Sequence, residues 1–155
     1  MLAELLRENY ILTDLKARDK GEALEEMIDA ISSRVRGFDR AAALAALLSR
    51  EKLGSTGIGH GVAVPHGRLK GLSEIIVFFA RSSKGVEFDS MDKMPVHLFF
   101  VIIVPEHAIA AHLKILASIS HLLKSQEFRV KLMKSGKESE IYRTMVDADR
   151  HSAAI

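Results

Sequence analysis

Two apolar runs are the strongest feature of the hydrophobic pattern. They cover residues 75–80 and 96–104 and are rich in Val, Ile and Phe. Runs of this length and composition are typical of strands that are buried on both faces of a sheet, and helices must then cover both faces. A shorter strand is predicted at residues 10–15, where it would lie at an edge of the sheet.

Two helices are predicted before the first of these runs, because apolar residues recur there every three or four positions. Asp19 can cap the first helix, with Glu22 three residues later as in a capping box, and Gly37 ends it. Asp39 caps the second helix, which Gly54 closes. The side chains predicted to face the core are Leu24, Met27, Ile28, Ile31 and Val35 from the first helix and Leu44, Leu47 and Leu48 from the second.

Three further helices are predicted after the second apolar run, over residues 106–124, 126–134 and 138–147. Together with the buried strands they indicate an α/β fold, a three-layer α/β/α sandwich around a small mixed β-sheet. A chain of 155 residues has the size of one ordinary domain, so residues 1–155 are predicted to form a single domain.

The segment between the second helix and the first apolar run, residues 50–68, is rich in glycine. Glycines without a Cβ let several backbone N–H groups point at one spot, which suits an anion such as phosphate. The segment is neither a P-loop nor a dinucleotide fingerprint, since His60 and Gly61 replace the required Lys and Ser/Thr, and Val62 replaces the third glycine. The spacing leaves both a phosphate cradle and a mobile structural turn open. The glycines are Gly54, Gly57, Gly59 and Gly61.

His66 stands at the end of a short predicted strand, residues 62–64. Pro65 forbids a further ladder hydrogen bond, and Gly67 allows a turn directly after the histidine. The imidazole is therefore expected to be fixed on one side and open on the other. A neutral imidazole has one free nitrogen that can accept a phosphoryl group at neutral pH. The alternative is a turn histidine that only hydrogen-bonds to the backbone.

The same segment resembles the signature of a known family. It contains Arg-Glu-Lys-x-Gly-Ser-Thr-Gly-Ile-Gly-x-Gly-Val-Ala-Val-Pro-His-Gly, which is similar to the signature of the enzyme IIA component of the bacterial phosphotransferase system, in its fructose/mannitol and nitrogen-regulatory class. The likeness continues in the same order through residues 85–89, residues 95–98, the pair 104–105 and the pair 112–113. It covers nearly the whole chain.

The resemblance implies a phosphocarrier that takes a phosphoryl group on His66 from the system's histidine-containing phosphocarrier protein. The group then passes to a cysteine of an enzyme IIB partner, or its presence acts as a regulatory signal. No metal or nucleotide cofactor is expected. The residues implied as catalytic are His66, His112 and Arg50, and those implied as phosphate-binding are Ser55, Thr56, Gly57 and Gly67.

Helical geometry by itself supports only part of this assignment. At 100° per residue His112 shares a face with Ile115, Leu116 and Ile119, whereas His121 lies 180° round and is expected to face water. A histidine on an apolar face is also compatible with a core role, and Arg50 could simply interact with the end of a helix dipole. Likewise, the hydroxyls of the predicted phosphate-binding residues could merely cap the loop.

Composition restricts the possible partners and cofactors. The chain has 22 basic and 20 acidic residues, interspersed so that no single stretch is expected to carry the net charge of +2, which argues against a dedicated nucleic-acid surface. It has no cysteine, so it offers neither a thiolate metal site nor a fused acceptor cysteine, and the partners are expected to be separate proteins. No signal peptide or membrane-spanning run is recognised, which predicts a cytoplasmic protein.

His60 leaves the subclass open, because many nitrogen-regulatory members carry Asn at this position and sugar-transport members often carry His. A free-standing chain favours the nitrogen-regulatory branch. Two other interpretations remain. One is a binding module with an idle His66 and an apolar surface around Ile58, Val62 and Leu69. The other is a metal site built from His60, His66 and His112, which lacks an obvious orienting carboxylate. The remaining histidines are predicted to be structural (His97) or exposed (His107, His151).

Overall fold

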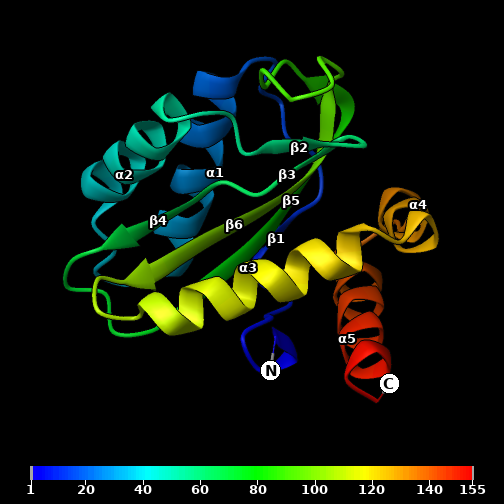
Figure 1. The fold of residues 1–155 in the computed structure, drawn as a ribbon. Helices are drawn as coiled ribbons and strands as arrows, with labels where there is room; N and C mark the ends of the chain where they lie inside the picture. The colour runs from blue at the N-terminus through cyan, green and yellow to red at the C-terminus, as the bar shows by residue number, and fades with distance from the viewer. Residues whose placement is uncertain (1, 155) are drawn as a thin grey trace.

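Both apolar runs form strands of one mixed sheet in the computed structural model, which describes residues 2–154. The strands are β1 (Ile11–Leu12), β2 (Gly57–Gly59), β3 (Val62–Ala63), β4 (His66–Leu69), β5 (Ile76–Val86) and β6 (Val96–Pro105). Their order is β1-β5-β6-β3-β2, and β4 also pairs with β6 (Figure 1). β5 and β6 are antiparallel, whereas β3 and β4 run parallel to β6.

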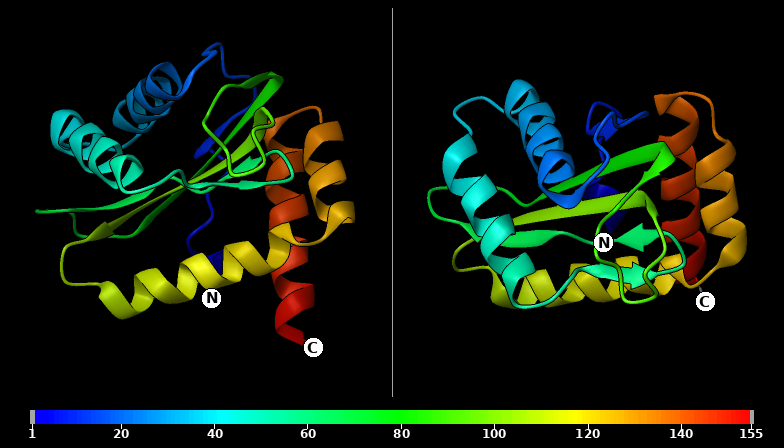
Figure 2. Two further views of the ribbon diagram at one scale, coloured as in Figure 1. Left: turned by 45° about the horizontal axis from the view of Figure 1, so that its top comes forward. Right: turned by 90° about the horizontal axis from the view of Figure 1, so that it is seen from above.

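Helices cover both faces of this sheet (Figure 2). One face carries α1 (Lys20–Arg34) and α2 (Arg40–Lys52), and the other carries α3 (Ile109–Leu123), α4 (Gln126–Lys134), α5 (Glu138–Ala154) and the short 3₁₀ helix η1 (Leu2–Glu4). The predicted three-layer α/β/α sandwich is therefore confirmed. Among the described helices, none combines the length and the apolar character needed to cross a membrane.

β6 shows why its run has no polar residue between its third and last positions. Leu98, Phe100 and Ile102 pack into the core beneath α3, α4 and α5, whereas Phe99 and Val101 pack into the core beneath α1 and α2. Successive side chains of a strand point to opposite faces, and here both faces are covered. All five side chains are almost fully buried.

The predicted helix caps are present. The Asp19 carboxylate accepts the Glu22 backbone N–H at 2.9 Å, and the Asp39 carboxylate accepts that of Ala42 at 3.1 Å. The Glu22 carboxylate accepts the N–H of Arg18 at 3.1 Å, one residue before the cap itself. Each cap satisfies an amide that has no partner within its helix, and so fixes where the helix begins.

Several helix details differ from the prediction. α1 ends at Arg34, so Val35 is its C-cap rather than part of its buried stripe. On α2, Leu47 is buried and Leu44 half-buried, but Leu48 is 38% exposed, and its predicted inward position is wrong. One residue step turns a helix by about 100°, which takes Leu48 off the face that Leu47 buries. α3 starts later than predicted, at Ile109, and α5 continues beyond residue 147.

The strand at residues 10–15 shortens to Ile11–Leu12, whereas β5 extends well past residue 80. β5 continues because Arg81 finds partners inside the fold: its guanidinium donates to the carbonyls of Thr13 at 3.1 Å and Leu132 at 2.7 Å. After an irregularity the ladder resumes with Val86 opposite Val96. The predicted strand end at residue 80, just before the polar Arg81, is therefore wrong.

The predicted turn after His66 is wrong, because His66–Leu69 continues as β4 beside β6. Nor does Pro65 end the ladder, since its carbonyl accepts the Ile102 N–H at 2.9 Å. Gly67 serves packing instead. A Cβ at this position would lie 3.2 Å from the Cβ of Ala46, so glycine lets β4 lie close against α2.

Gly85 is expected to be one of the positions least tolerant of a side chain. Its φ is +92°, and an added Cβ would lie 2.9 Å from the Pro95 Cβ and 3.1 Å from the His97 ring. Gly71 has a similar φ of +85° but nothing within 4 Å. Urea unfolding should show a loss of about 1 kcal/mol for Gly71→Ala, from backbone strain alone, and about 3 kcal/mol for Gly85→Ala. Equal losses would contradict this packing.

Candidate active site

His66 is the first residue of β4 and is held from one side. Its Nδ1 lies 2.7 Å from the Val64 carbonyl oxygen. A carbonyl can only accept a hydrogen bond, so Nδ1 carries the ring hydrogen of the neutral imidazole and Nε2 carries the lone pair. The ring is half-buried. The backbone thus fixes both the orientation of the imidazole and its tautomer.

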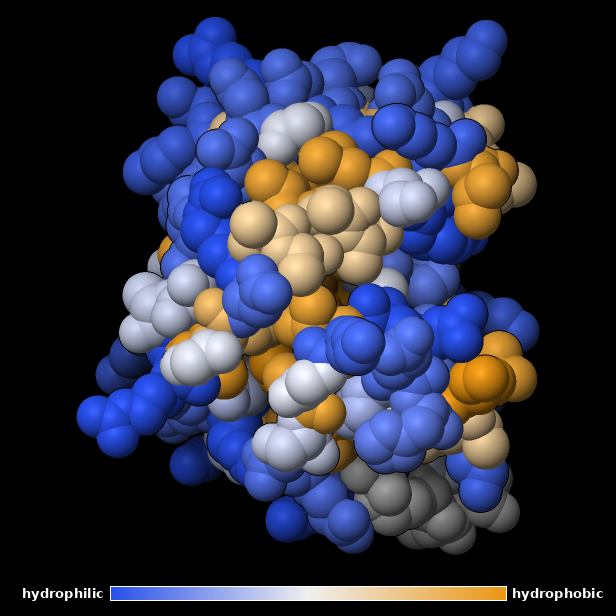
Figure 3. Space-filling model, turned by 90° about the vertical axis from the view of Figure 1, so that its left-hand side faces the viewer, coloured by the Kyte–Doolittle hydropathy of each residue, from blue (hydrophilic) through white to orange (hydrophobic). Residues whose placement is uncertain are grey.

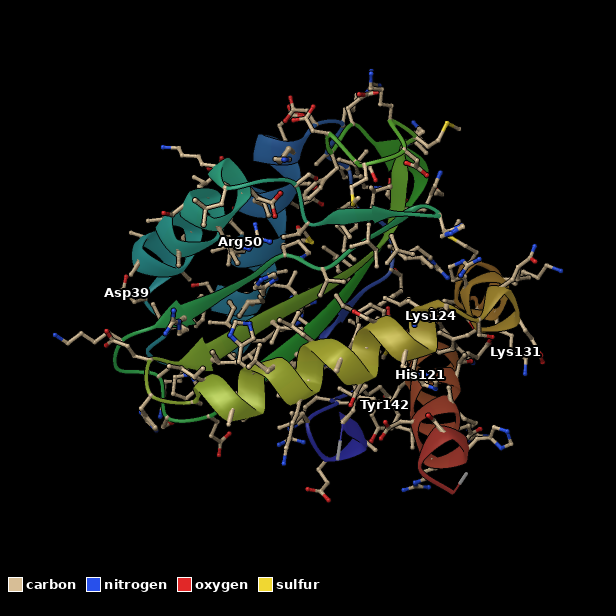
Figure 4. All side chains as sticks on the ribbon, in the orientation of Figure 1. Asp39, Arg50, His121, Lys124, Lys131 and Tyr142 are labelled. Atoms are coloured by element: carbon tan, nitrogen blue, oxygen red, sulfur yellow. The ribbon has the colours of Figure 1, made fainter. Side chains whose placement is uncertain are left out.

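Arg50 lies in the last turn of α2 (Figure 4) and contacts His66 from there. Its Nη1 donates to the Gly54 carbonyl at 2.8 Å, which fixes the guanidinium at the start of the loop. Its Nε lies 3.3 Å from Nε2 of His66 and donates to it. A guanidinium in this position presents several donors next to the one free nitrogen of the histidine.

His112 reaches the same site from α3 on the other face of the sheet. The ring centroids of His66 and His112 are 5.2 Å apart, and the two planes meet at 72°. Within the part of the chain that the structure describes, the buried Nε2 of His112 has no hydrogen-bond partner. Buried polar atoms are nearly always paired, so this nitrogen is available for a group that enters the site.

Both imidazoles favour their neutral forms. The pKa of His66 lies below its ordinary value of 6.5, chiefly because the ring is buried and then because the Arg50 charge is near, while the Val64 carbonyl acts in the opposite direction. Burial also lowers the pKa of His112, with smaller contributions from His66 and Arg68. His66 is therefore mainly uncharged at pH 7, and its Nε2 lone pair accepts the Arg50 N–H instead of carrying a proton.

An NMR titration of the ring protons should place both pKa values below 6.5. Arg50→Gln should raise the pKa of His66 toward 6.5, because a nearby positive charge disappears. Since the native values lie below that of the unfolded chain, the two histidines favour the folded state above pH 6.5. This contribution is lost as the pH falls from 6.5 toward the native pKa values. A His66 pKa at or above 6.5 in the native protein would contradict this geometry.

The four residues predicted to bind phosphate have partners within the protein. The Ser55 hydroxyl donates to the Phe88 carbonyl at 2.9 Å and accepts the Gly57 N–H at 3.0 Å. The Thr56 hydroxyl donates to the Glu51 carboxylate. A Cβ on Gly57 would lie 2.9 Å from the Ser90 Oγ, and Gly67 packs against α2 as described above. These residues shape the loop, and a direct contact of theirs with phosphate stays a prediction.

A family model described as "Phosphoenolpyruvate-dependent sugar phosphotransferase system, EIIA 2" matches residues 4–147. The chain belongs to this EIIA family. It is 42% identical over 141 residues to a nitrogen regulatory protein of Bradyrhizobium diazoefficiens, covering 91% of this chain and 92% of that protein. It is 34% identical over 140 residues to the fructose-specific EIIABC component of Bacillus subtilis, covering 90% of this chain and 22% of that longer protein.

Solved structures agree with this membership. The crystal structure of nitrogen regulatory protein IIA-Ntr from Neisseria meningitidis superposes with a TM-score of 0.86 at 33% identity, covering 93% of this chain and 98% of that chain. The EIIA fold therefore accounts for the architecture described above. The predicted family resemblance, which rested on residues 50–67 and the later segments, is confirmed.

Sequence reasoning missed Glu51, which anchors the loop of this EIIA chain. Its carboxylate is buried, accepts the Thr56 N–H at 3.1 Å and the Thr56 hydroxyl, and forms an ion pair with Lys20 Nζ at 3.1 Å. The Lys20 ammonium also lies 5.0 Å from the centre of the Phe88 ring. Glu51 follows Leu47 by four positions on the buried face of α2, and this spacing was the signal available in the sequence.

The structure bears on the two other interpretations, the apolar binding surface and the three-histidine metal site. Val62 and Leu69 are core residues at 1% and 4% exposure, so the apolar surface predicted around them does not exist, and only Ile58 of that set is exposed. Among the described residues, no group of three or more metal-ligating side chains is arranged to hold an ion. His60 instead lines a separate groove beside α4.

The other histidines lie as predicted. His107, His121 and His151 are exposed. His97 is half-buried, and its Nδ1 donates to the Ser82 carbonyl at 2.8 Å, which is a structural contact.

Proposed function

We propose that this EIIA chain accepts a phosphoryl group on Nε2 of His66 from a phosphohistidine of the phosphotransferase system's histidine-containing phosphocarrier protein. The observation that carries the proposal is the hydrogen bond between Nδ1 and the Val64 carbonyl at 2.7 Å. It leaves Nε2 as the only nucleophilic nitrogen of the ring and directs it toward Arg50 and His112.

The transfer would be an in-line displacement at phosphorus. The Nε2 lone pair forms the new N–P bond while the N–P bond of the donor breaks, and the electron pair of that bond returns to the donor imidazole. Negative charge spreads over the three equatorial oxygens in the transition state, so stabilising that charge is the main contribution that a protein can make. Arg50 supplies a positive charge and N–H donors beside Nε2, and His112 supplies a second imidazole within reach.

Partners that exchange phosphoryl groups with His66 must contact the surface around it. Figure 3 shows apolar side chains exposed among hydrophilic ones on the side of the molecule where β4 and β6 end and α3 begins. Ile109 and Leu113 of α3 are 54% and 64% exposed. Exposed apolar groups with a polar surround are common where proteins dock transiently. We place the carrier protein, and then an enzyme IIB or a regulatory target, on this surface.

Two relatives that carry the name nitrogen regulatory protein match 91% and 93% of this chain, at 42% and 33% identity. We therefore propose a regulatory role, in which the phosphorylation state of His66 changes which proteins bind. Transfer onward to a separate enzyme IIB is the second role within the same chemistry, and the fructose-specific relative is the observation that favours it.

Heteronuclear NMR of the phosphorylated protein tests which nitrogen reacts. Ring ¹H–¹⁵N correlations of His66 should show the phosphoryl group on Nε2, with Nδ1 still protonated. Phosphorylation on Nδ1 would contradict the proposal, because the hydrogen bond to the Val64 carbonyl would have to break. A phosphoryl group found on His112 instead would reverse the roles of the two histidines.

A further inference from the structure

A second concave surface lies beside β6, away from His66. It is a groove of about 330 Å³ between α4 and the turn that joins β2 to β3. Leu98 lines this groove, whereas His66 pairs with Ile102, four residues further along β6. At about 3.3 Å per residue the two places are about 13 Å apart along the strand. The groove is therefore separate from the candidate active site.

The charged groups that line this groove are all basic. Arg129 and Lys134 reach it from α4, and the imidazoles of His97 from β6 and His60 from the β2–β3 turn lie beside them. None of the described residues that line the groove is acidic. Asp92 contacts the β2–β3 turn from outside the lining: its carboxylate accepts the backbone N–H of His60 at 3.2 Å and that of Met94 at 3.0 Å. Two permanent cations, both from α4, therefore face the groove beside two imidazoles, and no acidic side chain among the described lining residues neutralises them.

Charge along the chain agrees with this picture and corrects the expected even distribution. Residues 124–137 contain five basic residues and one acidic residue, whereas the whole chain carries a net charge of only +2. The acidic residue, Glu127, forms an ion pair with Lys131 at 3.5 Å. Both of these line a larger groove between α4 and α5, where Glu140, Asp147 and Arg143 mix the charges further. Only the smaller groove has a single sign of charge.

The floor of the smaller groove is apolar. Leu98 is buried, and Val130 and Met133 expose 40% and 38% of their surfaces. A cavity of a few hundred Å³ with an apolar floor and a few converging polar groups is typical of small-molecule sites. Two permanent cations with the His60 imidazole beside them suit a dianionic phosphate better than a single carboxylate.

We propose that this groove binds a small organic phosphate, with the phosphate group against Arg129, Lys134 and the His60 imidazole and the rest of the molecule over the apolar floor. Arg129 is already oriented, because its Nη1 donates to the Leu123 carbonyl, and its other N–H groups remain for the ligand. His60 holds a φ of +57°, which places its side chain at the tip of a tight turn.

Titration of the ¹⁵N-labelled protein with adenosine 5′-phosphate, glucose 6-phosphate and inorganic phosphate, at constant ionic strength, tests the proposal. At least one organic phosphate should cause saturable shifts at the amides of Gly61, Leu98 and Val130. Because this site does not depend on His66 chemistry, His66→Ala should bind equally well. No saturable shift at these amides with any of the three, at millimolar concentration, would overturn the proposal.

Two variants on one helix supply the decisive comparison. Lys134→Gln removes a cation that lines the groove and should weaken binding about tenfold, the loss of one charge-assisted hydrogen bond. Lys131→Gln makes the same charge change on the α5 side of α4 and should leave binding unchanged. Equal weakening by both would indicate general attraction of anions and overturn the proposal. Binding of an acidic peptide in the groove, without binding of any of the phosphates, would also overturn the proposal.

His60→Asn gives a further variant that should fold normally. Asn tolerates the left-handed region better than most residues, so the turn keeps its conformation while the imidazole is lost. Binding should weaken several-fold with an unchanged unfolding midpoint. Full affinity in this variant together with full affinity in Lys134→Gln would overturn the proposed site.

Discussion

Arg50→Gln is expected to slow phosphoryl transfer to His66 by about 10²-fold or more, the usual cost of removing one preorganised donor from a charged transition state. The guanidinium lies 3.3 Å from Nε2 and is held by the Gly54 carbonyl, so its charge is already in place when the phosphoryl group arrives. Rapid-quench measurement of phosphorylation by the phosphorylated carrier protein gives this rate.

The matched control is Lys52→Gln, which removes the same charge from the same helix end at an exposed position. It should change the rate only slightly, and the change should vanish at high salt, because exposed charges are screened. Arg50→Lys should recover only part of the rate, since an ammonium lacks the planar fork of donors. If Lys52→Gln slowed transfer as much as Arg50→Gln, Arg50 would act by general attraction alone.

Glu51→Ala is expected to cost about 3 kcal/mol of unfolding free energy, as removing one partner of a buried ion pair does. The substitution leaves Lys20 without its buried partner, and it leaves the Thr56 N–H and hydroxyl unsatisfied. Urea unfolding measures the loss. Because Thr56 is the last residue of the loop before β2, the variant should also be phosphorylated more slowly under conditions where it is still folded.

Glu127→Ala serves as the control for that experiment. It breaks an ion pair whose side chains are 81% and 63% exposed, and it should change stability by less than about 1 kcal/mol. Glu51→Gln keeps one carbonyl acceptor and should lie between the two. A loss for Glu51→Ala no larger than for Glu127→Ala would show that Glu51 does not anchor the loop.

Local patterns predicted the fold well where one physical cause dominated. The run at residues 96–104 could only be a strand covered on both faces, and the caps at Asp19 and Asp39 began their helices as expected. The predicted ends of strands were wrong where contacts with residues far away in the sequence determined them. β5 extends past Arg81 because carbonyls from other parts of the fold accept hydrogen bonds from its guanidinium. The sequence near Arg81 does not indicate that those carbonyls are close to it.

In the candidate site, too, local patterns predicted some features, whereas others depend on contacts between distant parts of the chain. His112 was placed on the inward face of its helix by periodicity, and the structure brings its ring within 5.2 Å of that of His66. The meeting itself could not be derived from periodicity, because it depends on how α3 crosses the end of the sheet. Ser55 and Thr56 were predicted to bind phosphate or to cap the loop, and the residues that accept their hydroxyls, Phe88 and Glu51, could be identified only from the folded chain.

Intact-mass measurement after incubation with phosphoenolpyruvate, the system's enzyme I and its carrier protein tests the central claim most directly. The wild-type protein should gain the mass of one phosphoryl group in an acid-labile form. His66→Ala should gain none, while the carrier in the same mixture becomes phosphorylated. If the wild-type protein stays unmodified beside a phosphorylated carrier, or if His66→Ala gains the same mass, His66 is not the acceptor.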